Sequence, residues 1–166
     1  MGVCPRAAGP GIVCDLSRAA PQRMDTLTHA LSGALLARAT AATADSHLDA
    51  LSLRARLGAG FIAAAFPDSD VVLRAAGTLT YLNGHQGLTH SLVLLPLWAW
   101  ALALAFGRLT GRRWQAFYMT AALGLAAHIA GDVITAYGTA VWAPWSAHRV
   151  SLPLVFVIDP VFTAII

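Results

Sequence analysis

The chain has 166 residues, of which 57% are hydrophobic and only 11% charged. Its mean hydropathy is +0.63. Charged residues make up roughly a quarter of an ordinary soluble domain, so the composition argues against that class. It predicts an all-α protein, an integral membrane helical bundle of four to five helices, some of them short or half-membrane. The net charge of +3 comes from scattered arginines, without the basic stripe and interleaved aromatics of a nucleic-acid binder.

Residues 1–23 are rich in Gly, Pro and Arg and show no helical pattern. We expect them to be a disordered N-terminal tail, or to precede the true start of translation at Met24. Residues 24–166 then form one membrane-embedded domain. The chain ends inside the apolar run 151–166, so we expect it to be truncated at its C-terminus.

Four segments are predicted to be helical: residues 26–42, 57–66, 91–106 and 114–137. The first contains Ser32 and Gly33, small residues that let membrane helices pack closely. The second stops at Pro67 and, at ~15 Å of helix, is too short for a ~30 Å bilayer core. The polar residues 43–56 should lie outside the hydrocarbon. The segments 107–113 and 138–149 should be connectors.

The helices 91–106 and 114–137 should be antiparallel neighbours, because a short connector joins them. His90 lies about as far before this connector as His128 and Asp132 lie after it, so all three should reach the same depth. His128 and Asp132 are i and i+4 and share one helix face. His85, in the same Gly-containing stretch as His90, should lie at the same end of the bundle.

Further metal-capable side chains can join this end. Asp68 and Asp70 follow the short helix, and His29 lies near the start of the first helix. Neutral imidazoles and carboxylates suit zinc, manganese or iron. These histidines and aspartates are more ligands than one tetrahedral ion needs, so they favour a site with two metal ions. Such a site activates a water molecule as the nucleophile. Ser91 and Thr89 are then expected to cap a helix or donate hydrogen bonds.

Each of these residues also has a structural explanation. The alternatives are helix caps, turns, interfacial contacts and a His–Asp pair that ties helices together. Ionisable groups inside a membrane helix are nevertheless functional candidates by default, and the series as a whole favours metal ligation. The residues weighed in this way are His29, Asp68, Asp70, His85, His90, His128, Asp132 and Asp159.

The arginines bear on orientation. Arg108, Arg112 and Arg113 in the connector before residue 114 predict a cytoplasmic loop, with the His/Asp set at the opposite membrane face. Arg54, Arg56 and Arg74 are expected on the other side of the membrane from this loop. Basic residues on both sides weaken the prediction that the loop is cytoplasmic. The five tryptophans are expected mainly to pack or to form interface belts.

Several short motifs occur together in one order. They are Asp25-Thr-Leu-Thr-His29, Phe66-Pro-Asp68-Ser-Asp70, His85-Gln-Gly-Leu-Thr-His90-Ser91, His128 with Asp132, Tyr137-Gly138 and Asp159-Pro160. From about Met24 onward the chain resembles the bacterial membrane-bound metal-dependent hydrolases of the YdjM type, which are distantly similar to zinc-dependent phospholipase C. The resemblance implies an all-helical fold, a multi-pass location in the bacterial inner membrane and phosphoester hydrolysis.

One position departs from the resemblance. The family usually has arginine after the first histidine of its central motif, where this chain has Gln86. If that arginine contacts substrate phosphate, its charge is missing here. Arg74 and Arg149 are the candidates to replace it.

The sequence therefore predicts a membrane-bound metal-dependent hydrolase that cleaves a phosphoester, with a lipid or lipid-linked substrate favoured by location. Asp70, His90 and Asp132 are the expected catalytic residues, and zinc, or else manganese, is the expected metal, with two ions bound. Two alternatives remain, a metal-ion transporter or channel component and a structural membrane protein. The expected metal ligands are His29, Asp68, Asp70, His85, His90, His128, Asp132 and Asp159.

Overall fold

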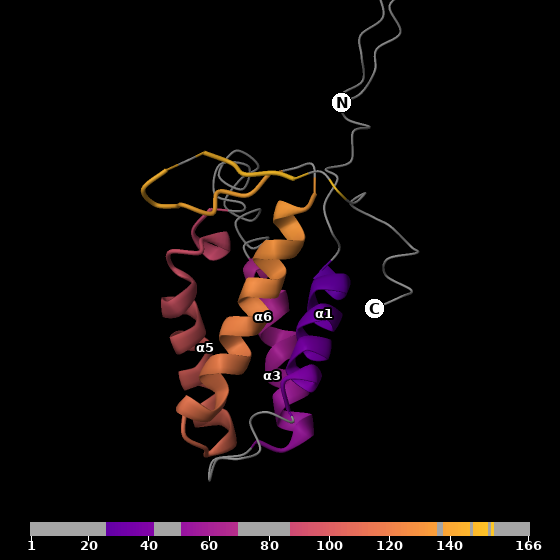
Figure 1. Cartoon of the computed structure of the whole chain (residues 1–166). Coiled ribbons are helices and arrows are strands. Elements are labelled where there is room, and N and C mark those ends of the chain that lie inside the picture. Colours follow the sequence, from indigo (N-terminus) through magenta and orange to yellow (C-terminus); the bar gives the residue numbers. More distant parts are fainter. Residues whose placement is uncertain are drawn as a thin grey trace, which may run out of the picture.

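The computed structural model describes residues 26–41, 51–69, 87–135, 138–146, 148–152 and 154. This part of the chain contains four α-helices and two short 3-10 stretches, at residues 66–69 and 88–90, which confirms the all-α prediction (Figure 1). Its only β pairing is an isolated antiparallel bridge between Thr139 and Val150. The helices are α1 (Thr26–Ala39), α3 (Leu53–Ala65), η3 (Leu88–His90), α5 (Leu95–Thr110) and α6 (Gln115–Val133).

Helices α5 and α6 form the predicted hairpin, with slightly different ends. Helix α5 starts at Leu95 rather than at residue 91, because η3 and a turn at 92–94 come first. It runs on to Thr110 and ends at Gly111, whose φ of 67° is the left-handed conformation that glycine adopts most easily. Helix α6 stops at Val133 rather than Tyr137, because the N–H and hydroxyl of Thr135 both donate to the carbonyl of Asp132.

Helix α3 begins at Leu53, so the predicted helix start at residue 57 was four residues too late. Ser52 is its N-cap, and the Ser52 side chain accepts a hydrogen bond from the backbone N–H of Ala55 at 3.4 Å. Leu51 is buried in a core cluster with Phe106 and Phe117. Because Leu51 is buried among these side chains, the residues just before α3 pack against the bundle, and α3 starts directly after them at Leu53.

Glycines bring α1, α3 and α6 into backbone contact. A Cβ added at Gly33 would lie 2.4 Å from the carbonyl oxygen of Gly60, and one added at Gly124 would lie 3.0 Å from the same oxygen. Small residues at helix crossings give this close approach in membrane proteins. The prediction of close packing at Gly33 is therefore confirmed. Ser32 instead donates to the carbonyl of Thr28, one turn earlier in its own helix.

Charged side chains occur only near the ends of the four helices. Helix α6 has Asp132 in its last turn and no other charge. The charges of the other three helices are the arginines Arg38, Arg54, Arg56 and Arg108. Exposed apolar side chains lie between these ends on every helix; examples are Leu35, Ile62, Leu97 and Met119.

All four of these arginines lie at the same end of the bundle, together with Arg112 and Arg113. Helices α1 and α5 run toward this end, whereas α3 and α6 run away from it (Figure 1). The expectation that Arg54 and Arg56 lie on the other side from the α5–α6 connector was therefore wrong. The reason is that α3 starts where α1 has just ended, and that is the end reached by the α5–α6 connector.

Within the described residues, one helix, α6, is long and apolar enough to cross a membrane, and α5 is apolar but shorter. At ~1.5 Å per residue α6 measures ~28 Å, close to the ~30 Å of a bilayer core. A bundle with several crossings stays a prediction.

Candidate metal centre

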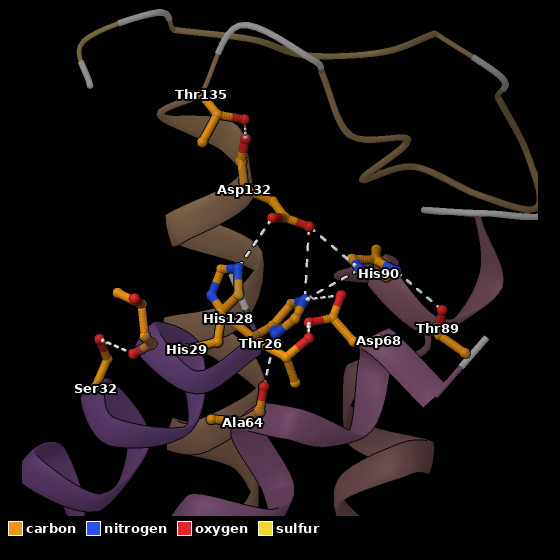
Figure 2. Close-up of polar contacts among 11 residues, drawn as sticks. Thr26, His29, Ser32, Ala64, Asp68, Thr89, His90, His128, Asp132 and Thr135 are labelled. Atoms are coloured by element: carbon orange, nitrogen blue, oxygen red, sulfur yellow. Dashed lines mark hydrogen bonds and ion pairs between the residues drawn. The ribbon is translucent and has the colours of Figure 1, made fainter. Parts of the chain in front are cut away.

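Five polar side chains meet at the end of the bundle opposite the arginines (Figure 2). Each comes from near a helix end: α1 provides one, the 3-10 turn after α3 one, η3 one and the last turns of α6 two. Four of the five are almost fully buried, with exposed fractions of 0 to 3%, and the fifth, Asp68, is 17% exposed. They are His29, Asp68, His90, His128 and Asp132.

His128 is at the centre of this group. Its Nδ1 lies 2.6 Å from the carbonyl oxygen of Ala64 in α3. A carbonyl oxygen can only accept, so Nδ1 carries the proton, and in the neutral ring Nε2 carries a lone pair. That nitrogen points into the group, 3.8 Å from Asp68 Oδ1. The His128 ring also stacks on His29, with centroids 3.9 Å apart.

His90 approaches from the other side. Its Nε2 lies 3.0 Å from Nε2 of His128, and its Nδ1 lies 2.9 Å from the hydroxyl of Thr89. Two imidazole nitrogens this close repel when both carry lone pairs. Either a proton lies between them or a cation sits beside them.

Asp132 completes a triangle with these two nitrogens. Its Oδ2 lies 3.2 Å from His90 Nε2 and 3.5 Å from His128 Nε2, and the third side is the 3.0 Å between the nitrogens. A tetrahedral zinc with bonds of ~2.0–2.1 Å separates its ligand atoms by ~3.3 Å. The three atoms are therefore spaced as three ligand atoms of a tetrahedral zinc would be.

The second oxygen of Asp132 faces another histidine. Oδ1 lies 3.2 Å from Nε2 of His29. This nitrogen is buried, and apart from this ion-pair contact it makes no hydrogen bond of good geometry within the described part of the chain. A buried polar atom without a hydrogen bond costs stability unless something else binds it. Asp132 thus presents one oxygen to each side, as a carboxylate that bridges two ions does.

Asp68 is held by a neighbouring hydroxyl. Thr26, the first residue of α1, donates a hydrogen bond of 2.6 Å to Asp68 Oδ2. The other oxygen, Oδ1, remains directed toward His128. Asp68, His29 and His128 form a second group whose ligand atoms lie within 4.8 Å of one another. The two groups share His128, which offers only Nε2, so one ion alone can take that nitrogen.

The residues present fit a divalent metal. Three imidazoles and two carboxylates are the ligand types of zinc, manganese and iron sites. A backbone carbonyl that fixes the tautomer of a ligating histidine is the usual outer partner in such sites.

The structure brings together five of the eight residues predicted as ligands. The other three, Asp70, His85 and Asp159, lie outside the described residues, as do Gln86 and Arg74. Arg149 is exposed, and its guanidinium donates to the carbonyl of Gly138 at 3.2 Å.

Sequence reasoning missed three groups that orient the ligands. Thr26 was assigned no part in the site beyond its place in a motif, and Thr89 was expected only to cap a helix or donate hydrogen bonds. The carbonyl of Ala64 carried no signal, because a backbone atom is common to every residue. Ser91 caps the turn before α5, where its hydroxyl accepts from the N–H of Val93 at 3.1 Å.

Comparison with known proteins finds sequence similarity to a bacterial protein. The chain is 29% identical over 140 residues to the protein of Bacillus subtilis (strain 168) called uncharacterized protein YfhP. The match covers 82% of this chain and 42% of the relative, so the chain spans less than half of that relative's length. No solved structure matches.

A family model also matches. The family is described as YdjM inner membrane protein, and the match covers residues 24–166. That description names a membrane location. The chain belongs to the YdjM inner membrane protein family.

Proposed function

We propose that this protein is a membrane-bound metal-dependent hydrolase that cleaves a phosphoester, with two divalent ions, zinc or manganese, held by the His/Asp group. The observation that carries the proposal is the triangle of His90 Nε2, His128 Nε2 and Asp132 Oδ2, with sides of 3.0, 3.2 and 3.5 Å. Three protein ligands would leave the fourth position of a tetrahedral ion to water or substrate, as in catalytic rather than structural zinc sites.

Each residue has a defined part in this proposal. His90, His128 and Asp132 would hold the first ion. His29, Asp68 and the second oxygen of Asp132 would hold the other. An ion in such a site acts as a Lewis acid and lets water attack near neutral pH. In hydrolysis the water oxygen bonds to phosphorus, the ester oxygen leaves, and the two protons of water end on the products. Asp70, predicted as catalytic, and the ligands His85 and Asp159 would add to this set.

The position of the group supports hydrolysis over transport. His29 lies in the first turn of α1 and Asp132 in the last turn of α6. A transit site needs ligands near the bilayer centre and open to both sides, whereas this group lies at one end of the bundle. Exposed apolar side chains stand at the same end, among them Leu88, Trp142 and Trp145. They favour a lipid or lipid-linked substrate.

Metal content and turnover of the purified full chain test the proposal. We expect bound zinc or manganese by elemental analysis and hydrolysis of at least one member of a phosphoester panel. His90→Ala should abolish both, while His148→Ala, which alters an exposed histidine outside the group, should change neither. If His90→Ala keeps its full metal content, the assignment of the site is wrong. Metal uptake into proteoliposomes without hydrolysis of any panel member would favour transport instead.

A further inference from the structure

A second polar site lies at the opposite end of the bundle. There, a wide-open surface cavity of about 310 Å³ lies between the end of α5 and the start of α6. Three of its lining residues are the arginines Arg108, Arg112 and Arg113, and Trp114 lies beside them. No acidic residue is among the described residues that line it. The proposed hydrolase uses none of these side chains.

The backbone is shaped to gather the three arginines. Gly111 reverses the chain with a φ of 67°, and the N–H of Arg112 donates to the carbonyl of Gly107 at 3.0 Å. A Cβ at Gly107 would lie 2.9 Å from the carbonyl oxygen of Arg112. Glycine at this position therefore lets the connector fold back onto α5, which places Arg112 and Arg113 next to Arg108.

Three arginines that line one cavity can supply guanidinium groups to a phosphate bound there. Arginine binds phosphate oxygens through two parallel N–H bonds, and each guanidinium has five donors. Arg112 and Arg113 already make other interactions within the chain. With five donors each, they can keep those and still bind a phosphate.

The surroundings point to a lipid as the source of that phosphate. Trp114 is the N-cap of α6, the helix that is long enough to cross a membrane, and tryptophan is enriched at the membrane–water interface. Leu109, which follows Arg108 in the chain, is 83% exposed, and Met119, one turn after Gln115, is 63% exposed, so apolar side chains on both helices of this end are open to acyl chains. A free phosphate would need no such surface.

Charge around the cavity favours an anionic lipid. Six of the seven arginines in the described residues lie at this end, and the seventh is Arg149. The six are Arg38, Arg54, Arg56, Arg108, Arg112 and Arg113. Arginine is enriched on the cytoplasmic side of inner-membrane proteins, and clusters of basic residues there attract anionic headgroups.

We propose that the cavity formed by Arg108, Arg112, Arg113 and Trp114 binds the headgroup phosphate of an anionic phospholipid in the cytoplasmic leaflet. The bound lipid holds the arginine end at that leaflet. The His/Asp group then lies at the opposite face of the membrane. This site does not depend on the metal centre, so either assignment can fail without the other.

Calorimetric titration of the full chain in a neutral detergent tests the site. The probes are short-chain phosphatidylglycerol, short-chain phosphatidylcholine and inorganic phosphate. We expect phosphatidylglycerol to bind and the other two to bind far more weakly. If phosphatidylcholine binds as tightly, or if inorganic phosphate binds as tightly and displaces the lipid, an anionic-lipid site is excluded.

Two variants distinguish lipid binding in the cavity from general attraction of the lipid to the positive charge at this end of the bundle. Because each arginine near the surface contributes on the order of fivefold, the triple variant R108Q/R112Q/R113Q should bind phosphatidylglycerol about 100-fold more weakly. The double variant R38Q/R54Q removes charge at the same end but outside the cavity lining, and it should weaken phosphatidylglycerol binding far less than the triple variant does. Equal weakening in both would show general attraction and overturn the site.

A further variant keeps every charge. Leu104 also lines the cavity, and Leu104→Trp should fill part of it and weaken phosphatidylglycerol binding. Unchanged lipid binding in this variant would contradict the proposal even if the triple variant does not fold. Metal content, measured in parallel, should stay that of the unaltered chain, which separates this result from a failure of the metal centre.

Discussion

Replacing Asp132 by asparagine should remove metal-dependent stability while keeping the shape of the side chain. Asp132 is 3% exposed, and its two oxygens each lie 3.2 Å from a histidine nitrogen, that of His29 on one side and that of His90 on the other. The substitution removes the only negative charge in the first ligand triangle. An asparagine oxygen is also a far poorer zinc ligand than a carboxylate.

The expected magnitude follows from linkage. At a free metal concentration 100 times the Kd, binding stabilises the folded state by roughly 2.7 kcal/mol. Loss of an outer partner of a ligand weakens metal binding about 10- to 100-fold, and we expect loss of a charged ligand to reach at least about 100-fold. At the same metal concentration the variant would gain only roughly 0.4 kcal/mol.

Thermal unfolding followed by tryptophan fluorescence can measure this difference. For a chain of this size, about 2–4 °C per kcal/mol predicts that metal raises the Tm of the unaltered protein by about 5–10 °C. It should raise the Tm of Asp132→Asn by about 1 °C. The control is His148→Ala, which should respond to metal as the unaltered protein does. An Asp132→Asn protein whose Tm rises as much as the control's would refute the assignment of Asp132 as a ligand.

Two further substitutions examine what supports the site. Thr26→Ala should weaken metal binding about tenfold because Asp68 loses the hydroxyl that orients it, and Thr26→Ser should restore it; equal affinity in all three proteins would contradict that role. Gly60→Ala should lower the free energy of unfolding by about 1–3 kcal/mol, because its Cβ would lie 2.6 Å from the carbonyl oxygen of Gly33. Gly58→Ala in the same helix meets nothing within 4 Å and should instead stabilise by about 0.5–1 kcal/mol. Chemical denaturation measures both, and a stable Gly60→Ala would show that α1 and α3 are not in backbone contact.

The hairpin of α5 and α6 shows how far sequence reasoning reaches. The common depth of His90, His128 and Asp132 followed from counting residues on either side of one connector. Rise per residue is a local property of any helix, so the count did not depend on the rest of the fold. Helix ends were less predictable. The start of α3 depended on the burial of Leu51 against Phe106 and Phe117, which are distant in the chain.

The second half of the site depended on helices that no short connector joins. Asp132 Oδ1 meets His29 because α1 and α6 pack against each other and α3 packs against both, at Gly33, Gly60 and Gly124. How far each helix is rotated about its axis sets which side chain faces inward, and that rotation comes from packing. Composition and motif order named His29 as a candidate, but they gave no reason for its ring to stack on His128.

The sequence by itself determined the class of protein, the types of ligand and their order, because composition, periodicity and residue chemistry are local. Only the tertiary structure decided which atoms face one another. In the folded chain, Nδ1 of His128 donates a hydrogen bond to the carbonyl of Ala64, and Thr26 donates one to Asp68. The arginines of four helix ends lie together at the end opposite the His/Asp group. These are relations between separate helices, and they exist only once small residues allow those helices to pack.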